Sequence, residues 1–271
     1  MKEVIIAVLG MSGLGLFWAL VLVICSKVFY VEENPLIEKI LACLPGANCG
    51  ACGFAGCGAY ADAVAEEGAD ITLCPVNDDE GVECIAKLMG IEAGTRGPRL
   101  VAKLHCTGTK VNCEDRGGYE GLKTCTADTV TAGGSKACSY GCLGHGDCAR
   151  VCLFNAIKMS PDGLPVVIEE KCTACGKCVE ICPRDLFKLV PQDQKVFILC
   201  SSKDPGAIAR KACKVACIGC GICVKQEETG VFTMENYLAS VDYKKSKSAD
   251  PEKLAAAAAK CPQKIISINV E

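Results

Sequence analysis

The cysteine content constrains this chain more than any other feature of its sequence. The chain has 24 cysteines among 271 residues, far more than a folded core needs, so most of them must bind metal or form disulfides. Disulfides would require an exported protein. The N-terminus does not resemble a cleaved export signal, because no small-x-small cleavage site follows its apolar segment. We therefore expect most of the cysteines to bind metal.

The N-terminal segment from Val4 to Cys25 contains no charged residue. As a helix it would extend about 33 Å, enough to cross a hydrocarbon core of about 30 Å. We expect residues 1–30 to form a single transmembrane anchor. A lipoprotein signal ending at Cys25 is the alternative, although Val23 and Ile24 are bulky for such a site. Because free thiolates need a reducing compartment, the cysteine-rich part is expected on the cytoplasmic side of the cell inner membrane.

Residues 31–92 contain a first cysteine motif with the spacing C-x2-C-x4-C-x16-C. Three thiolates in one glycine-rich loop can bind three corners of a cubane, because glycine lets the backbone approach closely. A predicted helix over 58–67 would bring the fourth cysteine back to the loop. A structural zinc site is the alternative, although zinc sites usually pair two separated C-x2-C motifs. The sequence predicts a small helical [4Fe-4S] domain whose ligands are Cys49, Cys52, Cys57 and Cys74.

Residues 135–192 contain the two cysteine runs of a bacterial two-cluster ferredoxin. The second run reads C-x2-C-x2-C-x3-C-P, and in that fold the last cysteine of each run binds the other cluster. In the first run His145 replaces the middle cysteine, so we expect Cys138 to supply the missing ligand; His145 itself is the alternative. The predicted ligands are Cys138, Cys142, Cys148 and Cys182 for a second cluster, and Cys152, Cys172, Cys175 and Cys178 for a third.

Residues 193–271 resemble an incomplete second copy of the preceding segment. The stretch 101–109 resembles 196–203, and each leads to Cys-x3-Cys-x-Gly. In this alignment Glu227 stands in the place of Cys152, while the cysteines of one complete set are kept. The sequence predicts a degenerate ferredoxin-like domain with a fourth cluster bound by Cys217, Cys220, Cys223 and Cys261.

Eight cysteines have no place in these four sets. Cys25 lies in the predicted span, Cys84 is expected to be an ordinary buried residue of a helix, and Cys43 and Cys113 have no assigned partner. The segment 93–134 is interpreted as a connection between domains. The other four of these eight cysteines occupy related places in the two repeats. They are either free buried thiols or the ligands of a fifth cluster, and they are Cys106, Cys125, Cys200 and Cys213.

Composition and missing motifs narrow the partners. The formal net charge of -3 and the 5% aromatic content argue against a nucleic-acid surface. No G-x-G-x-x-G loop follows a predicted strand, so we expect no flavin or NAD on this chain. The predicted class is α+β: one transmembrane helix, a small helical cluster domain, and ferredoxin-like domains of which the last is degenerate.

The loop Leu-Pro-Gly-Ala-Asn-Cys49-Gly-Ala-Cys52-Gly, the span before it and the ferredoxin motifs after it resemble the iron-sulfur electron-transfer subunit of the Rnf complex over nearly the whole chain. The resemblance implies a membrane complex that couples electron transfer between ferredoxin and NAD to movement of sodium ions or protons. It implies that this subunit relays electrons from a soluble ferredoxin to the other subunits, without bond chemistry of its own. The alternative is a membrane-associated polyferredoxin that donates electrons to a corrinoid-type or other soluble redox enzyme.

Overall fold

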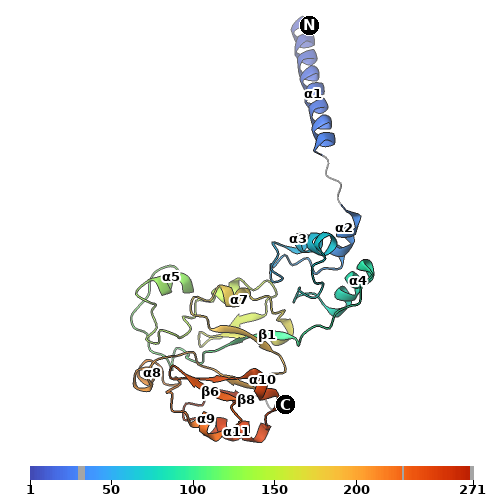
Figure 1. The fold of residues 1–271 in the computed structure, drawn as a ribbon. Coiled ribbons are helices and arrows are strands. Elements are labelled where there is room, and N and C mark those ends of the chain that lie inside the picture. Colours follow the sequence, from blue (N-terminus) through green and yellow to red (C-terminus); the bar gives the residue numbers. More distant parts are fainter. Residues whose placement is uncertain (30–33, 228, 269–271) are drawn as a thin grey trace.

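The computed structural model describes residues 1–29, 34–227 and 229–268. Helix α1 (Lys2–Val28) has 27 residues, none of them buried, and is long and apolar enough to cross a membrane. Figure 1 shows it as a separate rod at the N-terminus. A single N-terminal apolar helix is therefore present, whereas the expected boundary of the anchor at 30–31 lies outside the described residues.

The segment after the anchor forms a small helical unit around one core. The side chains of Ile40, Tyr60, Val64 and Ile85 are almost completely buried in it. The predicted helix over 58–67 is present, with its last turn in the wider π form, and it ends at Gly68 with a φ of 69°. The elements are α2 (Pro35–Ala42), α3 (Cys57–Asp62), its π continuation (Ala63–Glu67) and α4 (Asp79–Met89).

A disulfide joins Cys43, directly after α2, to Cys84 in α4. The expectation that Cys84 is an ordinary buried thiol is therefore wrong. The two helices pack against each other, which brings together two cysteines that lie 41 residues apart in the chain.

The next segment forms four strands in two nested antiparallel pairs. The outer strands β1 and β4 pair over five residues, and the inner strands β2 and β3 over three. Val101, Phe187 and Val190 are buried between these strands and the two cysteine runs. The elements are β1 (Leu100–Leu104), α5 (Cys125–Val130), α6 (Asp147–Arg150), β2 (Ile157–Met159), β3 (Pro165–Val167), the 3₁₀ turn Glu169–Lys171, α7 (Lys177–Glu180) and β4 (Phe187–Pro191).

The interpretation of 93–134 as a connection is wrong in one respect. This segment contributes β1 and α5 to the four-stranded unit, and Val101 and Ala102 of β1 are each only 1% exposed. The segment is part of the first repeat because β1 needs β4 as its hydrogen-bonding partner.

The C-terminal segment repeats the same nested pairing. Its outer strands β5 and β8 pair with each other, as do its inner strands β6 and β7. Figure 1 shows this second repeat beside the first. The predicted alanine-rich helix is present, and Asp250 caps it by accepting a hydrogen bond from the N–H of Glu252. The elements are β5 (Val196–Ile198), α8 (Gly206–Ala212), α9 (Ile222–Gln226), β6 (Phe232–Glu235), β7 (Leu238–Val241), α10 (Tyr243–Ser248), α11 (Pro251–Ala259) and β8 (Ile266–Ile268).

Candidate iron-sulfur sites

The cysteines gather in sets, but not at the spacing that a single ion requires. Within residues 1–29, 34–227 and 229–268, no three His, Cys, Asp or Glu side chains are placed to hold one metal ion. Instead, sets of cysteines surround small cavities lined by apolar side chains. A zinc ion draws its sulfurs to about 2.3 Å from one point, whereas a cubane spreads them around a larger group. The arrangement therefore fits a cluster better than zinc.

The cavity of the predicted third cluster is lined by all four of its expected cysteines. The Sγ of Cys152 accepts a hydrogen bond from the N–H of Ala156 at 3.3 Å, and the Sγ of Cys172 accepts one from Ala102 at 3.4 Å. Such donors stabilise sulfur that carries negative charge. Burial, together with the neighbouring Cys172, raises the pKa of Cys178 to about 12, so its thiolate needs a cationic partner. The set is Cys152, Cys172, Cys175 and Cys178.

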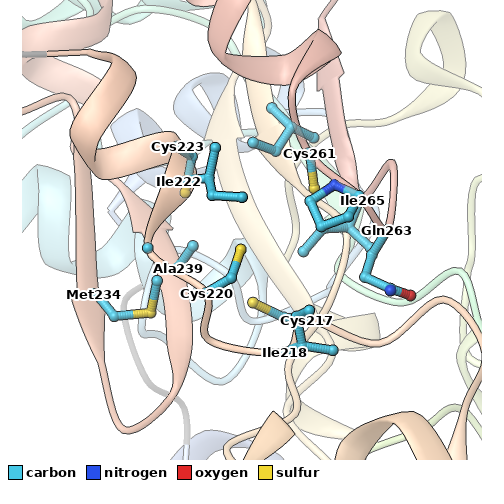
Figure 2. Close-up of a pocket in the computed structure, with 13 residues that line it drawn as sticks. Cys217, Ile218, Cys220, Ile222, Cys223, Met234, Ala239, Cys261, Gln263 and Ile265 are labelled. Atoms are coloured by element: carbon cyan, nitrogen blue, oxygen red, sulfur yellow. The ribbon is translucent and has the colours of Figure 1, made fainter.

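The predicted fourth set also converges on one cavity. Figure 2 shows its side chains around a common space with apolar walls, which include Ile218, Ile222 and Met234. Gly219 and Gly221 have φ of 64° and 69°, so the loop can turn tightly between its cysteines. The Cys261 ligand comes from the end of α11, far along the chain. The set is Cys217, Cys220, Cys223 and Cys261.

The loop of the first motif leads into the N-terminal end of α3, where Cys57 is the first helical residue. Asn48, with a φ of 47°, accepts a hydrogen bond on Oδ1 from the N–H of Cys57 at 2.8 Å, which fixes the turn of the loop. Arg96 donates to the carbonyl oxygen of Cys74 at 2.9 Å. Burial raises the pKa of Cys74, and Cys52 and Cys49 add to the increase. Three separated parts of the chain thus bring Cys49, Cys52, Cys57 and Cys74 together.

The second site differs from the predicted set in one ligand. Cys142, Cys148 and Cys182 lie together, but their fourth neighbour is Cys125 and not Cys138. Burial raises the pKa of Cys148 to about 12, and Cys125 is the next largest cause. We therefore expect Cys125, rather than the predicted Cys138, to be the fourth ligand of this site.

The local contacts explain the exchange. Cys125 begins α5, and its N–H donates to Oδ2 of Asp147 at 2.8 Å, which ties it to the first cysteine run. The carbonyl oxygen of Cys138 instead accepts a hydrogen bond from Arg184 at 2.6 Å, and its side chain lines a different cavity.

His145 has a partner other than metal in this structure. Its Nε2 lies 2.7 Å from Oδ2 of Asp128, a fully buried carboxylate that also accepts hydrogen bonds from Ser135. These hydrogen bonds lower the pKa of Asp128, although burial alone would raise it. The Nε2 atom of His145 is thus already engaged by a carboxylate.

The predicted fifth set is only partly brought together. Its member Cys125 lies at the second site. The other three line one cavity between the repeats together with Cys113 and Cys138, neither of which was expected there: Cys106, Cys200 and Cys213.

Comparison with known proteins agrees with the cysteine motifs. A family described as a putative Fe-S cluster matches residues 44–76, and a 4Fe-4S binding domain matches residues 165–188. The chain is 43% identical to the B subunit of the Na(+)-translocating ferredoxin:NAD(+) oxidoreductase complex of Acetobacterium woodii, over 100% of this chain and 80% of the relative. It is 41% identical to the proton-translocating counterpart of Clostridium ljungdahlii, over 97% of this chain and 91% of the relative.

A third similar protein comes from Methanosarcina acetivorans. The chain is 38% identical to the B subunit of the ion-translocating oxidoreductase complex of that organism, over 96% of each chain. The alignment with the Acetobacterium woodii subunit covers all of this chain and so includes the apolar helix, the first motif and both repeats. This chain belongs to the family of B subunits of the ion-translocating oxidoreductase complexes, the Rnf family.

Proposed function

We propose that this chain is the iron-sulfur electron-relay subunit of a membrane complex that couples electron flow between ferredoxin and NAD to movement of sodium ions or protons. The relatives carry such names, two of them for sodium ions and for protons respectively. Bound [4Fe-4S] clusters supply one-electron transfer. The chain itself binds and spaces the clusters, excludes water from them and carries out no bond chemistry.

The observation that carries this proposal is the adjacency of the cysteine sets. Cys49 of the first site contributes to the raised pKa of Cys175 in the third site, where burial is the largest cause. Cys148 of the second site likewise affects Cys178 of the third. The three sites therefore follow one another in the order first, third, second. A structural role for the metal would not require this contiguity, whereas electron transfer does.

We assign four ligand sets on this basis. The first, third and fourth are those predicted from the sequence, and in the second Cys125 replaces Cys138. In this assignment residues 1–30 anchor the chain in the inner membrane with the cluster-binding part on the cytoplasmic side. Residues 31–92 form the first cluster domain, 93–192 the two-cluster ferredoxin-like domain, and 193–271 the degenerate ferredoxin-like domain with one cluster.

The proposed partners are the other subunits of the complex, which would carry flavin and bind NAD, and a soluble ferredoxin that docks on the cluster-binding part. A direct test mixes the anaerobically purified full chain with stoichiometric reduced ferredoxin in a stopped-flow spectrophotometer. We expect the visible absorbance of the chain to bleach as the ferredoxin is oxidised, one electron for each cluster reduced. If the ferredoxin stays reduced although dithionite bleaches the chain, ferredoxin is not its electron donor.

A further inference from the structure

The cavity between the two repeats is lined by more cysteines than any predicted site. Five thiols line it, from both repeats: Cys106, Cys113, Cys138, Cys200 and Cys213. Cys113, Cys138 and Cys213 are at most 6% exposed. None of the five forms a disulfide in the structure. Ordinary buried cysteines are scattered singly through cores, so five around one cavity call for a ligand.

Four of these thiols form two pairs that the internal repeat relates. Cys106 and Cys200 occupy the same place after β1 and β5. The Sγ of Cys106 accepts a hydrogen bond from the N–H of Cys142 at 3.4 Å, and the Sγ of Cys200 accepts one from Cys217 at 3.3 Å. Because Cys142 and Cys217 are themselves equivalent in the repeat, the two hydrogen bonds are the same contact made twice.

The second pair shows the same equivalence. Cys138 and Cys213 each begin the Cys-x3-Cys segment of their repeat. In each, the backbone N–H two residues later, that of Tyr140 and that of Val215, lies close to the sulfur. Each repeat therefore supplies two thiols in matching geometry, and the cavity lies between the two halves of this arrangement.

The fifth thiol does not fit this symmetry. Cys113 pairs with Cys213 as an isolated β-bridge, which brings their two thiols close together. The second repeat has no cysteine at the equivalent distance after Cys200. The set that matches the four corners of a cubane is thus the symmetric one.

We propose that this cavity binds an additional [4Fe-4S] cluster through Cys106, Cys138, Cys200 and Cys213, a site that we call the inter-repeat site. The proposal rests on the electron-relay function above and extends it. The inter-repeat site would pass electrons between the second and the fourth site, because it contacts Cys142, a ligand of the second, and Cys217, a ligand of the fourth. One hydrogen bond joins each of these neighbours to the inter-repeat site.

The consequence is a continuous row of five sites in the order first, third, second, inter-repeat, fourth. Without the inter-repeat site, the fourth site would be separated from the second by the cavity and its thiols. The inter-repeat site would shorten that separation, because it contacts one ligand of each neighbouring site.

The test uses the full chain, purified anaerobically in detergent and reconstituted with iron and sulfide. Iron and acid-labile sulfide are measured for the wild type and for the double variant C138A/C213A, together with EPR of the dithionite-reduced proteins. We expect about twenty irons in the wild type and about sixteen in the double variant. The spin count should fall accordingly, and the EPR lines of the remaining clusters should sharpen because a magnetic neighbour has been removed.

Two further variants distinguish loss of the cluster from misfolding and test whether the ligand set is the right one. C106A/C200A removes the other symmetric pair and should lose the same four irons. C113A changes a thiol of the same cavity that is outside the set and should keep about twenty irons. Loss of the cluster in C113A, with retention in C106A/C200A, would overturn the ligand set.

The wild type separates failure of this inference from failure of the proposed function. About sixteen irons in the wild type, unchanged in both double variants, would overturn the inter-repeat site and leave the four-site relay intact. Zinc in place of iron, or little iron and sulfide at all, would overturn the proposed function as well.

Discussion

The two repeats have the same nested strand pairing, yet they hold different numbers of cysteine sets. In the first repeat the strand pairs β1–β4 and β2–β3 accompany two sets, whereas in the second β5–β8 and β6–β7 accompany one. The segment after β3 carries Cys172 and Cys175 in a loop and Cys178 in the short helix α7. The segment after β7 is helix α10 instead. The same strand pairing therefore accommodates either a cysteine-bearing segment or a helix at this place.

Glu227 stands in the second repeat at the place of Cys152 in the first. In the first repeat the Sγ of Cys152 accepts a hydrogen bond from the N–H of Ala156, four residues later. In the second repeat the carboxylate of Glu227 accepts one from the N–H of Val231, also four residues later, at 3.0 Å. Glu227 is 2% exposed, as expected of a side chain that satisfies backbone donors in a core. The same backbone contact is thus made by a thiol in one repeat and by a carboxylate in the other.

The largest expected effect distinguishes the two repeats by iron content. Cys152 and Cys182 each cross to the other set in the first repeat, so C152A should disturb both sites and lose about four to eight irons. Cys261 lies outside the cysteine runs that serve other sites, so C261A should lose only about four. Iron and sulfide analysis measures both, with C25A as the control. Unchanged iron in C261A would contradict the fourth site.

The second prediction concerns the position where the repeats differ in ligand type. His145 in the first repeat stands where the second has Cys220. We expect C125A to lose the second cluster, about four irons, and H145A to keep it. In the double variant C125A/H145C the new thiol occupies the place of Cys220, so the cluster should return. The readout is iron content together with EPR.

The assignment of Cys125 would be contradicted if C125A kept all of its iron. C138A serves as the comparison, because it should affect the inter-repeat site and leave the second site loaded. The double variant C125A/C138A should therefore lose about eight irons, the sum of two independent sites.

The smallest effect is expected at Glu227. The E227Q variant keeps the shape but accepts hydrogen bonds from Val231 and Thr229 with only one oxygen, so we expect a loss of about 1–3 kcal/mol in unfolding free energy. E235Q, at an exposed position of the same repeat, is the matched control and should cost almost nothing. Thermal unfolding of the loaded protein measures both. Equal stability of E227Q and wild type would contradict a structural role for this carboxylate.

The pH dependence of that difference has a definite sign. Hydrogen bonds from Thr229 and Val231 lower the pKa of Glu227 below its ordinary 4.5, although burial opposes this. A lowered pKa in the folded state means that the contribution is fully present above pH 4.5 and is lost as the pH falls through the lowered value. The difference in unfolding free energy between wild type and E227Q should therefore become smaller as the pH falls.

The spacing of cysteines along the chain predicted the sets in which three ligands lie in one short segment. The sequence grouped the cysteines of the third and fourth sets as the structure does, and it predicted the apolar helix and the alanine-rich helix. It exchanged Cys125 and Cys138 because Cys138 stands only four residues before Cys142, whereas Cys125 lies within the longer segment between Cys106 and Cys138. The longer segment contains α5, and no local spacing shows where its cysteine returns.

The disulfide between Cys43 and Cys84 was not predicted for a related reason. Its formation depends on packing of α2 against α4, which no spacing in the sequence encodes. The same holds for Cys113, which reaches the inter-repeat cavity through its pairing with Cys213. Long-range contacts of this kind follow from the assembled fold.

The most direct test of the central claim is anaerobic iron and acid-labile sulfide analysis of the full chain, with EPR of its dithionite-reduced form. The four-site relay predicts about sixteen irons per chain with equal sulfide, the inter-repeat site raises this to about twenty, and the reduced protein should show signals of [4Fe-4S] clusters. Twelve irons or fewer after careful reconstitution, or zinc in place of iron, would contradict the account.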